Sequence, residues 1–81
     1  MTDKAEWKPR DFKQNPHPPQ RDYVRFDELT LPDGGVIARI EQFRMNDRCF
    51  YATTPGERSG CLNNYEAARM WCEHHAGNKV N

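Results

Sequence analysis

The sequence predicts an α+β fold, in which a three-stranded antiparallel β-meander carries one C-terminal α-helix on one face and follows a Pro-rich extended tail. Three observations support this prediction. Two runs rich in β-branched and aromatic residues, 23–31 and 36–43, flank the turn sequence "PDGG". Residues 64–77 repeat apolar side chains at helical spacing. Four of the six prolines lie before residue 20.

The N-terminal segment is expected to be a tail. We assign residues 1–21 to a flexible Pro-rich tail, 22–77 to a β-β-β-α domain and 78–81 to a C-terminal tail. Proline lacks a backbone donor and restricts the preceding residue, so "NPHPPQ" cannot continue a helix. The isolated aromatic residues Trp7 and Phe12 either fold back onto the domain or dock into a partner.

Period-two alternation identifies the strands after the first turn. In the second strand Val36, Ala38 and Ile40 share one face, which we predict to be the core face. A second turn is expected at Asn46 and Asp47, because these residue types tolerate the left-handed conformation. The third strand is then predicted over residues 49–54 and ends at "PG".

A helix is predicted to begin near Asn64 and to end at Gly77. Asn63 followed by Glu66 has the spacing of a capping box. One apolar stripe is formed by Tyr65, Ala68, Trp71, Cys72 and His75. We expect this stripe, with Trp71 as its largest member, to hold the helix on the sheet, whereas the histidines only occupy the C-terminal end.

Composition excludes several classes of protein. Twelve basic and twelve acidic residues cancel, so no global field attracts nucleic acid or an anionic membrane. Mean hydropathy is −1.08, and no apolar run approaches the length of a membrane span or a signal peptide. We therefore expect a cytoplasmic protein, in the host cytoplasm if a phage encodes it. The odd number of cysteines, 3, favours reduced thiols.

Neither metal nor catalytic chemistry has a strong pattern. A zinc site would have to use Cys49, Cys61, Cys72 and His75, but structural zinc sites bring ligands in closely spaced pairs, which these residues lack. The sequence contains no Gly-rich phosphate loop, no G-x-S-x-G turn and no H-E-x-x-H pair. We expect no cofactor, no catalytic residues and no enzyme activity.

Arginines on the strands suggest an alternative function. Arg25, Arg39, Arg44 and Arg48 are on or near the predicted strands, and sheets with arginine-bearing strands can read the major groove. Over residues 22–76 the predicted architecture resembles the arm-type domains of phage integrases and the plant AP2 domain. That resemblance implies a DNA- or RNA-binding module. Acidic residues interleave with these arginines, however, whereas phosphate contacts need uncompensated positive charge.

Protein binding is the function that we predict. Aromatic residues and arginines together are enriched at interface hot spots, and the outer face of the sheet is expected to carry both. The predicted partner-binding residues are Arg25, Arg39, Phe43, Arg48 and Tyr51, with Trp7 and Phe12 from the tail. Exposed strand edges also allow a homodimer.

In size, neutral charge and sheet-plus-helix body, ending in "NNYEAARMWCEHH", the chain resembles small accessory proteins of phages and mobile elements, including anti-CRISPR proteins. This resemblance of type implies a non-enzymatic inhibitor that covers a functional surface of a host protein or protein complex. Many such inhibitors are strongly acidic mimics of DNA. The neutral charge of this chain instead favours shape-specific binding.

Overall fold

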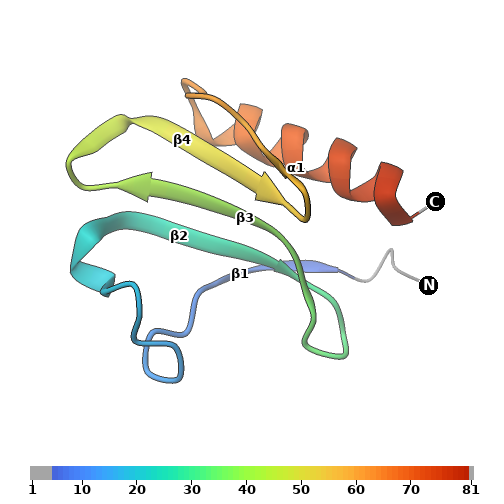
Figure 1. Cartoon of the computed structure of the whole chain (residues 1–81), viewed down its shortest axis with the longest axis horizontal. Helices are drawn as coiled ribbons and strands as arrows, with labels where there is room; N and C mark the ends of the chain where they lie inside the picture. Colours follow the sequence, from blue (N-terminus) through green and yellow to red (C-terminus); the bar gives the residue numbers. More distant parts are fainter. Residues whose placement is uncertain (1–4, 81) are drawn as a thin grey trace.

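The computed structural model describes residues 5–80, with side chains over 5–76, as one open antiparallel sheet and one long helix (Figure 1). The sheet has five strands in the order β1-β2-β3-β4-β5. The elements are β1 Glu6–Pro9, the 3-10 turn η2 Gln20–Asp22, β2 Tyr23–Thr30, β3 Val36–Phe43, β4 Asn46–Thr54, β5 Glu57–Arg58 and α1 Tyr65–Val80.

The predicted α+β class is confirmed, but the three-stranded sheet preceded by an extended tail is not. Within the predicted tail, β1 pairs antiparallel with β2 and places Trp7 opposite Leu29. Trp7 packs against the core, and the burial of this large ring accounts for the ordered pairing. At the other edge, β5 forms inside the loop "PGERSG" and pairs with β4. Residues 1–4 of the predicted tail are outside the described residues.

One of the two predicted hairpin turns is in the expected place. In "PDGG", Gly34 has φ +95° and donates its N–H to the carbonyl of Leu31. The turn predicted at Asn46 and Asp47 is wrong, because both residues belong to β4 and Phe43 pairs directly with Asn46. The connection between β3 and β4 is instead the dipeptide Arg44–Met45, so β4 begins before the predicted residue 49.

The core lies between one face of the sheet and α1, which packs on β3 and β4. It consists of Leu29, Ala38, Ile40, Ala52, Ala68 and Cys72. Three of these six residues are alanines, and such small side chains let the helix approach the sheet closely. Val36, predicted to join Ala38 and Ile40 in the core, is 36% exposed instead, since it lies at the start of its strand.

The start of the helix differs from the prediction by one residue. Oδ1 of Asn64, not of Asn63, accepts the N–H of Ala67 at 2.7 Å, as expected when the helix begins at Tyr65. The helix continues past Gly77 to Val80, into the predicted C-terminal tail; Asn81 is outside the described residues.

The helical stripe is buried less evenly than predicted. Ala68 and Cys72 are fully buried, but Trp71 is only partly so and stacks on the ring of His75 at 3.9 Å. Because Nε2 of His75 also lies 3.6 Å from a carboxylate oxygen of Glu57, this histidine is not the bystander that we expected. It connects the helix with β5.

The expectation of three reduced thiols is wrong. Cys49 and Cys61 form a disulfide that joins β4 to the segment before α1, next to the isolated pairing of Phe50 with Leu62. Cys72 is the free cysteine, and burial raises the pKa of its thiol to about 12. Of the three cysteines, two therefore form a disulfide, and the third is a core residue.

Removing the disulfide should lower stability measurably. The bridge spans a sequence separation of 12, and the loop-closure entropy for a ring of this size corresponds to about 3 kcal/mol. We expect Cys49→Ser with Cys61→Ser to lower the free energy of unfolding in urea by about that amount. Reduction of the wild-type chain should reproduce the loss. An unchanged midpoint in both experiments would contradict the disulfide.

Candidate functional site

Aromatic rings gather on the face of the sheet opposite α1, which we call the open face. Strand pairing puts Phe26, Glu41 and Tyr51 side by side on this face, whereas the neighbouring row Asp27, Ile40 and Ala52 points to the helix. Phe12, Tyr23, Phe26, Phe43 and Tyr51 form a continuous cluster with centroid separations of 4.9–6.1 Å. The open face therefore has a hydrophobic layer of its own.

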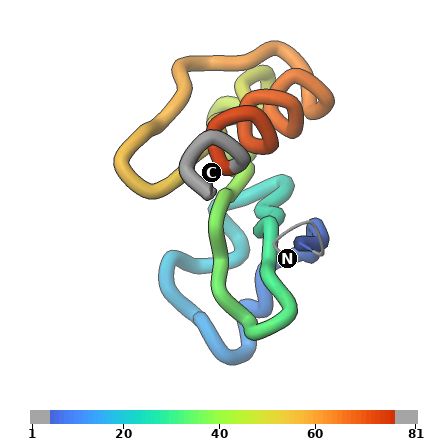
Figure 2. Tube along the Cα trace, turned by 90° about the vertical axis from the view of Figure 1, so that its right-hand side faces the viewer, coloured from blue at the N-terminus to red at the C-terminus, as the bar shows by residue number. Residues whose placement is uncertain are grey.

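One arginine fastens the loop between β1 and β2 to this layer. Nη1 of Arg10 donates to Oε2 of Glu28 at 2.9 Å, and Nη2 donates to the carbonyl of His17 at 3.0 Å. Its guanidinium also lies over the ring of Phe26, 4.9 Å from the centroid. Since both Arg10 and Glu28 are largely buried, the pair ties the proline-rich loop to the sheet. The loop and α1 lie at opposite ends of the molecule (Figure 2).

An open groove of about 940 Å³ remains between this loop and the β3–β4 hairpin. Its apolar lining is Pro18, Tyr23, Phe43, Met45 and Tyr51, and its polar lining includes Arg21, Asp22, Arg44, Asn46 and Arg58. We call it the open-face groove. Its volume is in the range of small-ligand sites, whereas a hollow beside Thr53 and Pro55 measures only about 190 Å³.

Met45 is the most exposed apolar residue at the groove. It is 100% exposed at the tip of the β3–β4 turn, where polar residues or glycine are usual. An apolar side chain in this position gains nothing from folding. Met45 lines the same groove as the partly exposed rings of Phe43 and Tyr51, and apolar residues gathered in one exposed patch are typical of interaction sites.

A polar contact orders the floor of the groove. The hydroxyl of Tyr23 donates to Oε2 of Glu41 at 3.3 Å, and Nη1 of Arg58 lies 3.7 Å from Oε1 of the same carboxylate. Burial, followed by the charge of Glu41, raises the pKa of Tyr23. The guanidinium of Arg58 also lies 5.2 Å from the centroid of Tyr51. These contacts fix both tyrosine rings.

The predicted site residues on the open face are Phe43, Tyr51, Phe12 and Arg39. Phe43 and Tyr51 line the groove with their ring centroids 5.9 Å apart. Phe12 packs beside them, against Tyr23. Arg39 shares this face through its pairing with Glu28, and its Nε lies 3.8 Å from that carboxylate.

The remaining predicted residues lie elsewhere. Nε1 of Trp7 donates to a carboxylate oxygen of Glu73 on the helix side. Arg25 donates to Asp27 at 2.8 Å and covers the ring of Tyr65 at 3.7 Å, so it belongs to the contact between β2 and α1. Arg48 is exposed near the start of β4 and does not line the groove. The predicted surface is thus divided between the two faces.

The candidate zinc ligands are not assembled into a site. Cys49 and Cys61 are joined to each other, and Cys72 is buried between α1 and the sheet with its thiol donating to the carbonyl of Arg39. The ring of His75 stacks on Trp71. Among residues 5–80 no group of three or more His, Cys, Asp or Glu side chains is arranged to hold a metal ion. Likewise, no described helix is long and apolar enough to cross a membrane.

Sequence reasoning missed the residues that surround the aromatic rings. The sequence predicted a tail or loop at three of these residues, Pro18, Arg21 and Arg58. It also predicted the second hairpin turn at residues 46–47, two positions after the observed turn, so Met45 was not recognised as the residue at its tip. An apolar residue between two polar ones at a hairpin tip was the available signal. Comparison of the chain with known protein families, curated proteins and solved structures finds no match.

The contact between Tyr65 and Asp27 predicts a shifted titration on the helix side. Burial, the hydrogen bond to Asp27 at 2.7 Å and the charge of that carboxylate raise the pKa of Tyr65 from 10.0 to about 12. Stability from this group is therefore complete below pH 10.0 and is lost as the pH rises toward 12. At pH 11, absorbance at 295 nm should show less tyrosinate in the folded chain than in urea.

The same titration of Tyr65→Phe serves as the control. This variant should lose much of the difference between folded and unfolded chains, and its free energy of unfolding should fall by about 1–3 kcal/mol, because Asp27 loses a donor. Identical titration curves for the folded and unfolded wild-type chains would contradict the contact.

Proposed function

We propose that this chain is a non-catalytic protein-binding module whose contact surface is the open-face groove. The observation that carries the proposal is the fully exposed Met45 next to partly exposed Phe43 and Tyr51, with arginines around them. Aromatic residues, methionine and arginine are the types enriched at protein interfaces. The rings are fixed by neighbours, so binding would cost little side-chain entropy.

The groove has the composition of a hot spot because apolar residues form its floor and charged residues form its rim. Tyr23 is 6% exposed and supports Phe43 from below, with ring centroids 5.0 Å apart. A partner side chain placed on Phe43 and Tyr51 would exclude water from a surface that is already rigid. Interface energy is usually concentrated in such central, well-supported contacts.

The alternative function, binding of DNA or RNA through strand arginines, has less support. It requires Arg25 and Arg39 to present their charge on one surface, but Arg25 pairs with Asp27 on the helix side and Arg39 lies near Glu28 on the other. Pairing with carboxylates reduces the charge available for phosphate. We therefore prefer a protein partner.

As a narrower form of the proposal, the module is an inhibitor carried by a phage or mobile element, and its partner is a host protein. A groove of this size suits the covering of one segment of that partner, which would block access to a functional surface. Occlusion of this kind requires no catalytic group in the inhibitor.

Two exposed methionines allow a matched test. After capture from bacterial lysate and identification of the retained protein, its affinity should be measured by calorimetry with Phe43→Ala plus Met45→Ala. Loss of a hot-spot pair should weaken binding about tenfold or more. Met70→Ala is the control, because Met70 is also exposed, at 64%, but lies on α1. A partner that binds wild type and double variant equally would remove the groove from the interface.

A further inference from the structure

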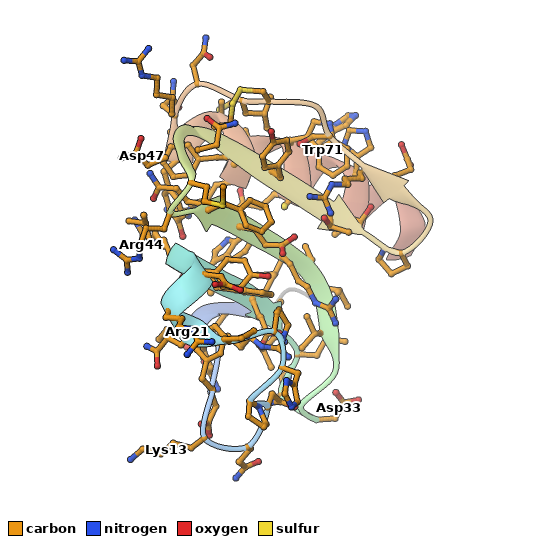
Figure 3. The ribbon with its side chains drawn as sticks, turned by 60° about the vertical axis from the view of Figure 1, so that its left-hand side comes forward. Lys13, Arg21, Asp33, Arg44, Asp47 and Trp71 are labelled. Atoms are coloured by element: carbon orange, nitrogen blue, oxygen red, sulfur yellow. A yellow bond between two sulfur atoms is a disulfide. The ribbon has the colours of Figure 1, made fainter. Side chains whose placement is uncertain are left out.

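The rim of the open-face groove carries more positive than negative charge. Its lining includes Arg21, Arg44 and Arg58, against the single described carboxylate Asp22. Glu41, behind the rim, accepts from Tyr23 and compensates part of the charge of Arg58. Arg21 and Arg44 against Asp22 leave this side of the groove with a net charge of about +1 at neutral pH, and Nε of Arg44 donates to the carbonyl of Arg21, so the two arginines are neighbours (Figure 3).

Arg44 is held in place by backbone acceptors. Its Nε donates to the carbonyl of Arg21 at 3.0 Å, and its Nη2 donates to the carbonyl of Tyr23 at 3.1 Å. Both acceptors are uncharged, so these bonds fix the orientation of the guanidinium without neutralising it. A planar guanidinium whose orientation is fixed by uncharged acceptors is well suited to binding a carboxylate.

We propose that the groove binds an extended acidic segment of another protein, in which a large apolar side chain is flanked by aspartate or glutamate. The apolar side chain would lie on Phe43, Met45 and Tyr51, and the carboxylates would face Arg21 and Arg44. The inference rests on the proposed function and adds the chemistry of the partner. Its basis is charge complementarity next to an apolar floor.

The ring geometry favours such a peptide over single-stranded nucleic acid. Base stacking needs a free, flat ring face, whereas an apolar side chain also packs against ring edges and against Met45. Arg58 lies over Tyr51, 5.2 Å from its centroid, and Phe43 contacts both Tyr23 and Tyr51, which reduces the ring face available to a base. The net charge of the whole chain is also zero, so it lacks the field that phosphate binding uses. A short acidic segment needs only the local charge of the rim.

The test is a titration of the full, ¹⁵N-labelled chain with defined peptides, followed by NMR. The first peptide has a central phenylalanine flanked on both sides by glutamates; in the second, lysines replace the glutamates; in the third, alanine replaces the phenylalanine. We expect the amides of Phe43, Met45 and Tyr51 to shift with the first peptide. The second and third should each bind about tenfold more weakly.

Charge reversal at the rim supplies the matched variants. Arg21→Glu should weaken binding of the acidic peptide about tenfold, because Arg21 is exposed at the groove. Lys13→Glu makes the same change in net charge at an exposed position in the loop, away from the groove (Figure 3), and should leave the affinity unchanged. Unchanged amide spectra outside the substituted region would show that both variants fold.

Several outcomes would overturn the inference. Equal binding of the glutamate and lysine peptides would remove the role of the arginines, and shifts confined to α1 would place binding on another surface. Tighter binding of an oligothymidylate, with steep salt dependence, would favour nucleic acid. If no acidic peptide binds but Phe43→Ala plus Met45→Ala still loses an identified partner, the proposed function stands and only the acidic chemistry fails.

Discussion

The packing of α1 on β3 and β4 through Ile40, Ala68 and Cys72 is the contact on which the other features depend. One helix covers one face of the sheet and leaves the opposite face without a partner layer. In a chain this small no second α-helix is present among the described residues, so the apolar side chains of that face have to be covered by loop residues and by one another. The aromatic cluster and the loop between β1 and β2 provide this second, covering layer, and the hydrogen bonds of Arg10 to Glu28 and His17 hold the loop on the sheet.

The second layer is incomplete, and the groove lies where it ends. Phe12 covers Tyr23 and Phe26, but the loop does not extend over Phe43 and Tyr51. Elsewhere among the described residues, the exposed large apolar side chains are Val24, Val36 and Met70, which lie on β2, β3 and α1. At the groove the turn residue Met45 enlarges the apolar surface instead of limiting it. The proposed binding surface and the incomplete hydrophobic layer are therefore the same feature of this fold.

Local patterns predicted the sheet-plus-helix fold, whereas long-range contacts determined what they missed. The strands β2 and β3 and the helix followed from periodicity and turn chemistry over neighbouring residues. Strand β1 depends on Trp7 reaching the core, and the disulfide depends on Cys49 meeting Cys61 across the edge of the sheet. Neither contact leaves a periodic signal. Phe43 and Tyr51 were found by their type, but the arginines beside them depend on how the loop folds.

The two ion pairs at Asp27 and Glu28 illustrate why the proposed function depends on the face of the sheet to which each arginine belongs. Adjacent residues of one strand point to opposite faces, so Arg25 joins Asp27 on the helix side while Arg39 lies near Glu28 on the open face. When the sequence alone is read, Arg25 and Arg39 look equivalent, because both are arginines on predicted strands. In the structure, Arg25 covers Tyr65 on the helix side, whereas Arg44 and Arg58 line the groove together with the partly exposed rings of Phe43 and Tyr51 on the open face. The charge on which the proposed binding depends is therefore local, although the chain as a whole is neutral.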